Sequence, residues 1–305
     1  MAVQPLSMPV TRAIMVTKGS WQISRAPAKV NLSLKVVGRR ADGYHLLDSI
    51  VVFSNFGDHL ALKPTLSAPT LSIRGPFAAN LESSPENNLA FLADRAFAEA
   101  FGGTRCDIRL WKRLPTAAGI GGGSADAAAV LRLKAKLAGI PLNDTDLNMV
   151  ALSLGADVPM CLRGRSARVG GVGETLIEAP MMPALPSVLV NPGVMLPTPS
   201  VFKLRSGPFS TSTTLPEAWN DLCEVSEAVN DLGNDLMQAA IHIEPVIKEV
   251  LSNLKAMAGL NVASMSGSGA TCFGLFDDLK SARQAARVLK RRWPGWWVAE
   301  MVLNP

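Results

Sequence analysis

The stretch Pro115–Ala129, PTAAGIGGGSADAAA, places four glycines within five positions, directly before a run of small residues. Glycine permits positive φ angles and leaves backbone N–H groups uncovered, so such a loop can close around an anion. The alanine-rich run Ala125–Leu137 predicts a helix, with Ser124 as its N-cap and Gly139 just after its end. A glycine loop leading into a helix N-terminus directs free N–H groups and the positive end of the helix dipole to one point. The stretch therefore predicts a phosphate-binding site, although a flexible turn before an N-cap would give a similar pattern.

Two common phosphate-binding motifs do not match this stretch. A Walker A loop has a lysine directly after its glycines, and none follows here. A dinucleotide-binding loop has a glycine at the position that serine occupies here. The candidates for phosphate contact are the residues of the loop itself: Gly119, Gly121, Gly122, Gly123 and Ser124.

The composition fits a globular protein that binds a small anionic molecule. The chain has 305 residues, enough for two domains or one large one, and its hydrophobic content of 48% excludes global disorder. A formal net charge of +5 suits a nucleotide but is too small to indicate a nucleic acid. The chain has one tyrosine and no basic stripe interleaved with aromatic residues. We therefore expect no nucleic-acid partner.

Cysteine spacing and hydropathy indicate a cytoplasmic protein. Cys106, Cys161, Cys223 and Cys272 are far apart and show no metal-ligand spacing, which is typical of buried thiols in a reducing compartment. No apolar run approaches the roughly 18 residues that would span a bilayer, so we expect no membrane partner. Residues 1–20 lack the continuous apolar segment of a signal peptide, and we expect a disordered extension there.

Periodicity predicts a mixture of strands and helices. In Lys29–Val37 apolar and polar residues alternate, which predicts a strand with one solvent-exposed face. Short strands are predicted within Gly57–Ile73, and a helix over Ser84–Ala100 that is capped by the asparagine at 87 or 88. The glycines at 170, 171 and 173 predict a hairpin turn before a strand at Thr175–Glu178, with a second phosphate loop as the alternative. The prolines of Pro180–Pro186 predict a boundary between two domains.

The glycine stretch resembles the phosphate loop of the GHMP kinases, the family of galactokinase, homoserine kinase and mevalonate kinase. Their motif is P-x-x-x-G-[LI]-G-x-S-[SA]-x, which Pro115, Gly119, Gly121 and Ser124 match with one extra glycine before the serine. The resemblance implies that Pro115 contacts ATP together with the loop. The resemblance implies an α+β fold with an S5-domain-2-like ATP-binding domain at 21–180 and a ferredoxin-like α/β sandwich at 181–305. It also implies ATP and Mg²⁺ as cofactors. Ala125 stands where many relatives have a second serine, so the ligands of the metal stay open.

Two further segments match family motifs that hold catalytic groups. A-P-A-K-V-N-L at 26–32 resembles the first strand of the family, which implies that Lys29 lies at the acceptor hydroxyl and that Asn31 contacts substrate. L-G-A-D-V-P at 154–159 resembles the motif that carries the catalytic aspartate, here Asp157. The residues alone leave two alternatives open, an exposed lysine at a strand end and an aspartate that caps a helix.

The segment R-R-A-D-G-Y-H at 39–45 resembles the branch of the family that phosphorylates 4-diphosphocytidyl-2-C-methyl-D-erythritol. The resemblance implies that Tyr44 packs on the cytosine and that His45 hydrogen-bonds its edge, which suits an aromatic face and a ring with donor and acceptor. Thr198 and Phe202 match the family segment P-T-x-x-[VI]-F, so Phe202 would cover the cytosine opposite Tyr44. A core tyrosine and a structural histidine are the alternatives.

The remaining motifs concern the nucleotide and the closing of the site. By resemblance Asn88 contacts adenine and Lys112 lies on the nucleotide side, while a plain helix cap and a solvated charge are the alternatives. The third family motif, Met265–Phe273, suits close backbone approach to substrate or phosphate. Its candidate contacts are Gly267, Ser268 and Gly269.

Together the resemblances imply transfer of phosphate from ATP to the 2-hydroxyl of this cytidine diphosphate ester of methylerythritol, a step of non-mevalonate isoprenoid synthesis. Asp157 would accept the proton of the hydroxyl or orient it, and Lys29 would stabilise the developing oxyanion. Two alternatives remain: a kinase of the same family for mevalonate, homoserine or a sugar, and a non-catalytic nucleotide-binding member. The sequence is compatible with a monomer or a dimer.

Overall fold

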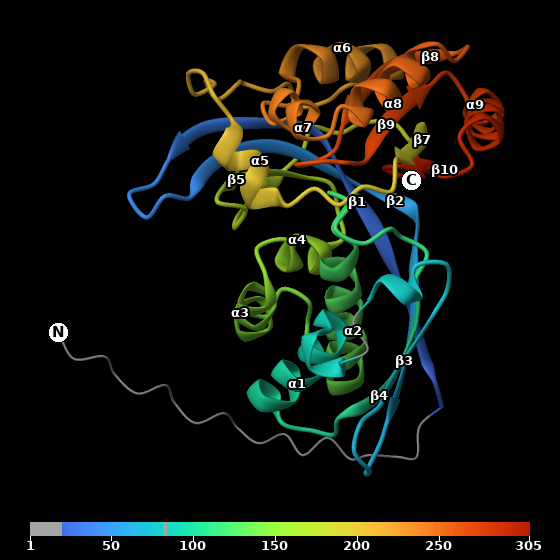
Figure 1. Cartoon of the computed structure of the whole chain (residues 1–305). Coiled ribbons are helices and arrows are strands. Elements are labelled where there is room, and N and C mark those ends of the chain that lie inside the picture. The colour runs from blue at the N-terminus through green and yellow to red at the C-terminus, as the bar shows by residue number, and fades with distance from the viewer. Residues whose placement is uncertain (1–19, 82–83) are drawn as a thin grey trace.

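The computed structural model describes residues 20–81 and 84–305. The extension expected at residues 1–20 therefore lies outside the described residues, apart from Ser20. Figure 1 shows two lobes joined by a long strand hairpin that runs through both of them. Among the described residues, no helix combines the length and the apolar character that crossing a membrane requires.

The hairpin consists of β1 (Gln22–Arg39) and β2 (His45–Pro64), which pair antiparallel along their length. The start of β1 and the end of β2 belong to the lower lobe, and the part of the hairpin around its tip curves over into the upper lobe (Figure 1). The second half of β2 replaces the first of the short strands expected after Gly57. One continuous strand forms because the residues from 57 to 64 find partners on both sides, β1 and the later strand β4.

The solvent-exposed face expected for the first strand is wrong. Asn31 and Ser33 are buried, as is Lys29, which lies well inside β1 rather than at its start. The reason is that the glycine loop and a segment of the upper lobe pack on this polar face. The backbone N–H of Lys29 donates to Ile120 O (3.1 Å), and that of Asn31 donates to Ser266 Oγ (3.0 Å).

In the lower lobe a sheet of order β3-β4-β2-β1 is covered on one face by helices (Figure 1). The apolar faces of the strands and helices form one core, which holds Leu60, Leu62, Phe97, Leu131 and Leu147. The hairpin of β5 and β6, predicted at the glycines 170–173, pairs with the curved part of β2 at residues 47–51, above α4 (Figure 1). The elements of this half of the chain after the long hairpin are β3 (Leu71–Arg74), α1 (Leu89–Phe101), β4 (Cys106–Trp111), α2 (Gly122–Ala138), α3 (Thr145–Leu154), α4 (Val158–Arg163), β5 (Ala167–Gly171) and β6 (Thr175–Glu178), with 3-10 turns at Ala78–Asn80 and Pro85–Asn87.

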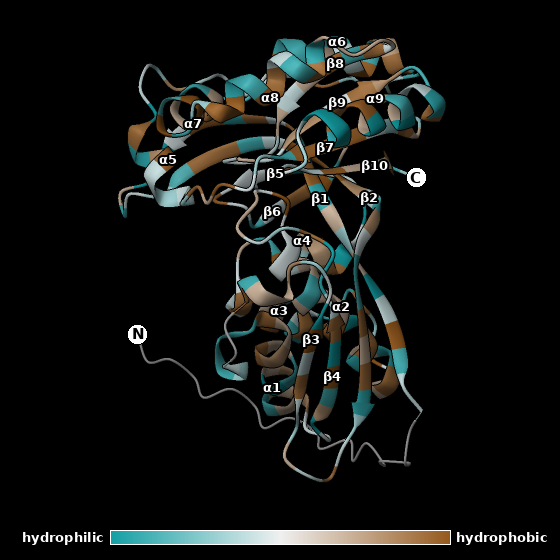
Figure 2. Ribbon diagram, turned by 45° about the vertical axis from the view of Figure 1, so that its right-hand side comes forward, coloured by the Kyte–Doolittle hydropathy of each residue, from teal (hydrophilic) through white to brown (hydrophobic). Residues whose placement is uncertain are grey.

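The upper lobe is a sheet of order β10-β7-β9-β8, and apolar residues follow its central strands β7 and β9 (Figure 2). Helices α8 and α9 pack with the strand residues Val188 and Val190, whereas α6 packs with Leu185 and Leu189. The elements are β7 (Leu185–Asn191), α5 (Thr198–Leu204), α6 (Leu222–Leu232), α7 (Met237–Ile243), α8 (Val246–Lys255), β8 (Leu260–Met265), β9 (Cys272–Phe276), α9 (Leu279–Arg292) and β10 (Trp297–Leu303).

The hairpin contributes to the cores of both lobes. Leu34 and Val36 of β1 pack in the same cluster as Val188 of the upper sheet. Residues of β2 farther along pack in the lower core. We therefore propose that the division near residue 180 holds for the chain after β2, while the hairpin belongs to both domains.

Candidate active site

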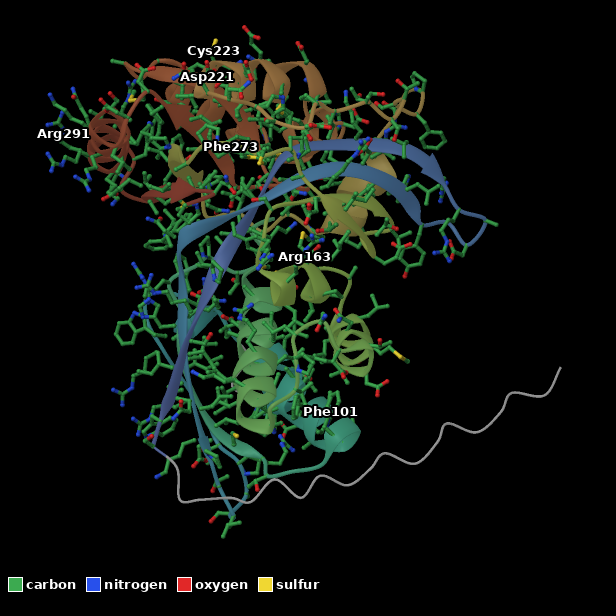
Figure 3. All side chains as sticks on the ribbon, turned by 180° about the vertical axis from the view of Figure 1, so that it is seen from behind. Phe101, Arg163, Asp221, Cys223, Phe273 and Arg291 are labelled. Carbon is green, nitrogen blue, oxygen red and sulfur yellow. The ribbon has the colours of Figure 1, made fainter. Side chains whose placement is uncertain are left out.

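A cavity of about 1230 Å³ lies at the junction of the lobes. Its lower wall is formed by the glycine loop and the start of α4, and its upper wall by the tip of the hairpin, the start of α5 and residues 267–268. Seen from behind, α4 (marked by Arg163) lies directly below the curved part of the hairpin (Figure 3). Segments from the two halves of the chain therefore meet at one site, as the order of the motifs predicts.

The glycine loop ends in the N-terminus of α2, which points to the cavity. The helix begins at Gly122, with Gly121 as its N-cap in the left-handed conformation (φ 65°). The prediction that Ser124 is the N-cap is wrong, because glycine adopts this backbone conformation freely and starts the helix earlier. The first-turn N–H groups of Gly122, Gly123 and Ser124 have no acceptor within the helix, and all three residues line the cavity. The end of the helix at Gly139 is confirmed.

Two glycines of the loop are required by close contacts. A Cβ atom on Gly119 would lie 2.6 Å from the carbonyl oxygen of Gly269. A Cβ atom on Gly121 would lie 2.6 Å from Cγ of Lys29. Both glycines also have positive φ angles. Bare backbone thus lets the loop pack against β1 and against the third motif at the same time.

The two catalytic candidates face each other in the cavity. Nζ of Lys29 lies 3.3 Å from Oδ2 of Asp157, and the side chain of Asp157 is 39% exposed while that of Lys29 is 8% exposed. Asp157 occupies the N-cap position of α4, but its carboxylate makes no capping bond there in the described chain. That leaves the carboxylate available to Lys29 and to the cavity. The prediction that these two residues act together is supported by this geometry.

Asn31 holds Lys29 from the opposite side. Its Oδ1 accepts a hydrogen bond from Lys29 Nζ (2.9 Å), and its Nδ2 donates to Ser49 Oγ (2.8 Å). Ser49 in turn donates to the backbone of Ser33 (2.5 Å). Asn31 lines the cavity as predicted, but both ends of its amide are engaged inside the protein. We infer that it positions the lysine in addition to any contact with substrate.

The hairpin tip and α5 form an aromatic end of the cavity. The rings of His45 and Phe202 stack with centroids 5.1 Å apart and an angle of 25° between planes. Burial and the charges of Arg39 and Arg205 lower the pKa of His45, which favours a neutral ring with one donor and one acceptor. Tyr44 also lines the cavity and is 66% exposed. The three predicted base contacts are thus together, with Phe202 against His45.

The third motif closes the cavity from the upper lobe. Gly267 and Ser268 line it, and the hydroxyl of Ser268 lies 2.8 Å from that of Thr198, the first residue of α5. Gly269 does not line the cavity. It is buried behind the loop, where a Cβ atom would meet the sulfur of Met265 at 2.8 Å. Its role is therefore to allow packing, not contact with substrate.

Two residues at the site carried no predicted role. Ser266 accepts a hydrogen bond from the N–H of Asn31 (3.0 Å) and donates to Gly119 O (3.1 Å), so it joins β1 to the phosphate loop. Asn234 donates to the carbonyl oxygens of Met265 (2.8 Å) and Gly267 (2.9 Å). Both residues lie in recognisable sequence motifs, N-D-L at 234–236 and M-S-G-S-G at 265–269. Their hydrogen-bond partners are distant in sequence, so the motifs alone do not predict these contacts.

Three predicted nucleotide contacts do not line the cavity. Lys112 is 2% exposed and lies between two carboxylates, so the alternative of a solvated charge is wrong. Asn88 caps α1 through a bond from Ala90 N to its Oδ1 (2.9 Å), as the helix-cap alternative states. Its neighbour Leu89 lines the cavity instead. Pro115 is buried and borders a separate depression of about 600 Å³. Contacts of these three residues with ATP remain predictions.

Comparison with known proteins decides the family. A sequence profile described as "GHMP kinases N terminal domain" matches residues 88–165, and one described as "GHMP kinases C terminal" matches residues 216–295. A relative from Paramagnetospirillum magneticum, named 4-diphosphocytidyl-2-C-methyl-D-erythritol kinase, is 51% identical over 277 residues, covering 90% of this chain and 95% of the relative. The chain belongs to the GHMP kinase family.

Other relatives of this GHMP kinase agree. A Rhodospirillum rubrum protein with the same name is 47% identical, with 91% of each chain covered. A solved structure named 4-(cytidine 5'-diphospho)-2C-methyl-D-erythritol kinase superposes with a TM-score of 0.75 at 35% identity, covering 93% of this chain and all of that one. A mevalonate kinase from L. major superposes with a TM-score of 0.61 at 13% identity, which shows a shared fold only. The predicted two-domain GHMP kinase fold is confirmed.

Proposed function

We propose that this GHMP kinase transfers the terminal phosphate of ATP to the 2-hydroxyl of 4-diphosphocytidyl-2-C-methyl-D-erythritol, a step of isoprenoid precursor synthesis. The observation that carries the proposal is the pair of Lys29 and Asp157, 3.3 Å apart, in the cavity that the glycine loop also lines. The relatives that carry this enzyme name cover nearly the whole chain. The aromatic end of the cavity, formed by Tyr44, His45 and Phe202, offers rings that can stack on cytosine and a histidine that can hydrogen-bond its edge.

The N-terminus of α2 is the place for the ATP phosphates. Phosphoryl transfer requires alignment and charge compensation rather than covalent chemistry from the protein. The first-turn N–H groups and the helix dipole offer fixed positive potential to the phosphates. Gly121 brings this helix start against Lys29, so the phosphate to be transferred would lie beside the catalytic pair.

Asp157 and Lys29 act on the acceptor hydroxyl. The carboxylate of Asp157 accepts the proton of the 2-hydroxyl or orients that hydroxyl toward the phosphate. The ammonium of Lys29 stabilises the negative charge that develops on the acceptor oxygen and on the phosphate. Asn31 holds the ammonium in place by its 2.9 Å hydrogen bond, so little reorganisation is needed when substrate binds.

The cytidyl end of the substrate would lie between the hairpin tip and α5. The stacked rings of His45 and Phe202 would part to admit the flat base, and Tyr44 would cover it. The neutral His45 can donate to a carbonyl oxygen or accept from an exocyclic amine. The cytosine would then lie at the aromatic end of the cavity, and the reacting hydroxyl at the end that holds Lys29 and Asp157.

Magnesium would enter with the nucleotide. The described residues contain no cluster of three or more His, Cys, Asp or Glu side chains that could hold a metal. Mg²⁺ in kinases is held largely by substrate phosphates and water, so we propose that the phosphates of ATP supply most of its ligands. The four cysteines are free thiols, which supports a cytoplasmic location. Three are buried as expected, whereas Cys223 is exposed on α6.

Phosphate transfer from ATP to defined acceptors tests the proposal. The purified protein should consume ATP with 4-diphosphocytidyl-2-C-methyl-D-erythritol and yield its 2-phosphate, while mevalonate, homoserine and galactose should support no turnover. Turnover with one of those three would assign a different kinase of the family. Nucleotide binding without turnover on any acceptor would indicate a non-catalytic member.

A further inference from the structure

Three buried ionisable side chains form a cluster directly behind the phosphate loop. Nζ of Lys112 lies 2.6 Å from Asp58 Oδ2 and 2.7 Å from Asp126 Oδ2. Lys112 follows β4, Asp58 lies in β2, and Asp126 lies in the second turn of α2. The side chains are 2%, 0% and 5% exposed, respectively. The mechanism above uses none of these groups.

The two carboxylates are held very differently. Asp58 accepts hydrogen bonds at Oδ1 from the backbone N–H groups of Arg113 (2.5 Å) and Leu114 (2.8 Å), in addition to its bond from Lys112. Asp126 has its single bond from Lys112, and its Oδ1 accepts none from any part of the chain that the structure describes. Hydrogen bonds to the ionised form stabilise it. A proton taken up by this cluster therefore goes to Asp126.

The charge count favours such a proton. With both carboxylates ionised, one ammonium leaves a net charge of −1 in a buried site, which is costly. Burial raises the pKa of Asp126 to about 7 against the opposing effect of Lys112, and Asp58 raises it as well. Asp126 thus changes its protonation state near physiological pH. Lys112 keeps its charge, because burial lowers its pKa but the two carboxylates together outweigh burial and raise it.

Apart from Asp58, the elements packed against α2 in the described chain place no carboxylate beside Asp126. From β2, His59 follows Asp58, and burial together with the charges of Arg113 and Arg25 lowers the pKa of its ring, which favours the neutral form. From α4, Cys161 faces this region, and burial raises the pKa of its thiol to about 12, so it stays neutral. From β1, Lys29 packs under Gly121 and pairs with Asp157. From α1, Asp94 is bound by Lys134 and Arg105. The ionisable residue of α3, Asp146, is exposed.

The cluster lies next to the expected phosphate position. Asp126 follows Gly122 by one helical turn, and a Cβ atom on Gly122 would lie 3.2 Å from Nζ of Lys112. An ionised Asp126 places uncompensated negative charge behind the N–H groups that would bind the phosphates. A protonated Asp126 leaves Asp58 and Lys112 as a neutral pair, and the dipole of α2 then acts on the nucleotide unopposed.

We propose that Asp126 is a positioning residue of the nucleotide site and that ATP binding is coupled to uptake of one proton by its carboxyl group. The coupling rests on the proposed kinase function, because it requires nucleotide phosphates at the start of α2. Since linkage is reciprocal, bound nucleotide favours the protonated carboxyl, and deprotonation weakens nucleotide binding to the same degree.

The test compares the wild type with Asp126→Asn, which is nearly isosteric and cannot ionise. Calorimetric titration with Mg²⁺ and a non-hydrolysable ATP analogue, in buffers of different ionisation enthalpy, measures affinity and proton uptake between pH 6 and 8.5. The wild type should take up more protons than the variant and lose about tenfold more affinity over this range, the effect of roughly one unit of pKa coupling. The variant should bind tightly at both ends of the range, apart from the titration of the analogue itself.

The possible results distinguish failure of the proposed kinase function from failure of the proposed proton coupling. If neither protein binds the analogue, the proposed kinase function fails. If both bind it with the same proton uptake and the same pH profile, Asp126 has a structural role only and the coupling is overturned. If Asp126→Asn does not fold, Asp126→Ser provides a smaller neutral side chain for the same comparison, with the same two decisive results.

Discussion

The ammonium of Lys29 lies 3.3 Å from the carboxylate of Asp157, and the two residues come from elements that do not pair, β1 and the start of α4. Asn31 holds the ammonium from the other side at 2.9 Å. Both residues of the pair line a cavity that also holds the start of α2. The active site is thus largely pre-organised, which is what a reaction that depends on alignment requires.

The phosphate loop can be tested with two glycines at opposite ends of one helix. Gly121→Ala places a Cβ atom 2.6 Å from Lys29 Cγ, at a residue with φ +65°. We expect ATP affinity to fall at least tenfold, because the loop and the lysine must both shift. Gly139→Ala is the matched control, with the same φ and nothing within 4 Å. It should cost about 1–2 kcal/mol of stability and leave ATP affinity unchanged. Equal loss of ATP affinity in both variants would mean that the loop has no special role.

The aromatic end of the cavity should affect binding of the cytidyl substrate but not binding of ATP. Phe202→Leu removes the ring that stacks on His45 at 5.1 Å. Loss of one base–aromatic stack costs about 1–3 kcal/mol, so KM for the cytidyl substrate should rise about tenfold or more. KM for ATP should stay constant, since Phe202 belongs to the opposite wall. A parallel rise in both values would place Phe202 in the packing of the lobes instead.

Ser266 should act through the loop and not through substrate. Ser266→Ala removes one acceptor of the Asn31 N–H and one donor to Gly119 O. Leaving these buried groups without partners costs about 1–3 kcal/mol, and we expect a lower thermal midpoint together with weaker ATP binding. Ser264→Ala, in β8 of the same segment, is the control and should leave ATP binding unchanged. Unchanged ATP binding in Ser266→Ala would show that the loop is held by other contacts.

The buried carboxyl of Asp126 predicts a pH-dependent gain in stability for Asp126→Asn. The pKa of about 7 in the folded state lies above the ordinary carboxyl value of about 3.9. The folded protein therefore keeps a proton that the unfolded chain has lost, and its stability falls as pH rises between roughly 4 and 7. The advantage of the variant in thermal midpoint should grow across this window and then level off. Asp231→Asn, at an exposed position of α6, is the matched control. A constant difference for Asp126→Asn would contradict the assignment.

Much of the site could be predicted because its motifs are local. The glycine loop, Lys29 and Asp157 each lie in a short segment whose pattern points to a role. The hairpin turn before Thr175 and the end of α2 at Gly139 follow from local backbone preferences as well. Such features need only neighbouring residues. The structure confirms the turn and the helix end, whereas the roles of the glycine loop, Lys29 and Asp157 stay predictions.

The remainder depends on contacts between distant segments. The ion pair of Lys112 with Asp58 could not be predicted, because Asp58 is 54 positions away and has no local signature. The polar face of β1 looked exposed because the segments that cover it, at Ile120 and Ser266, come much later in the chain. Burial of these groups follows from tertiary packing, which periodicity alone does not report.

The central claim is that Asp157 acts directly on the acceptor hydroxyl while Lys29 stabilises the charge that develops. Lys29→Met should also lower turnover, and the double variant should lose much less than the product of the single losses, because the two residues act as one unit.

The most direct measurement is the turnover of Asp157→Asn with ATP and 4-diphosphocytidyl-2-C-methyl-D-erythritol, alongside the affinities for both. This substitution keeps the size and hydrogen-bonding shape of the side chain and removes its charge. We predict that turnover falls by roughly 10²–10⁴ while both affinities change little. Turnover near the wild-type rate would show that the carboxylate is structural and would contradict the mechanism.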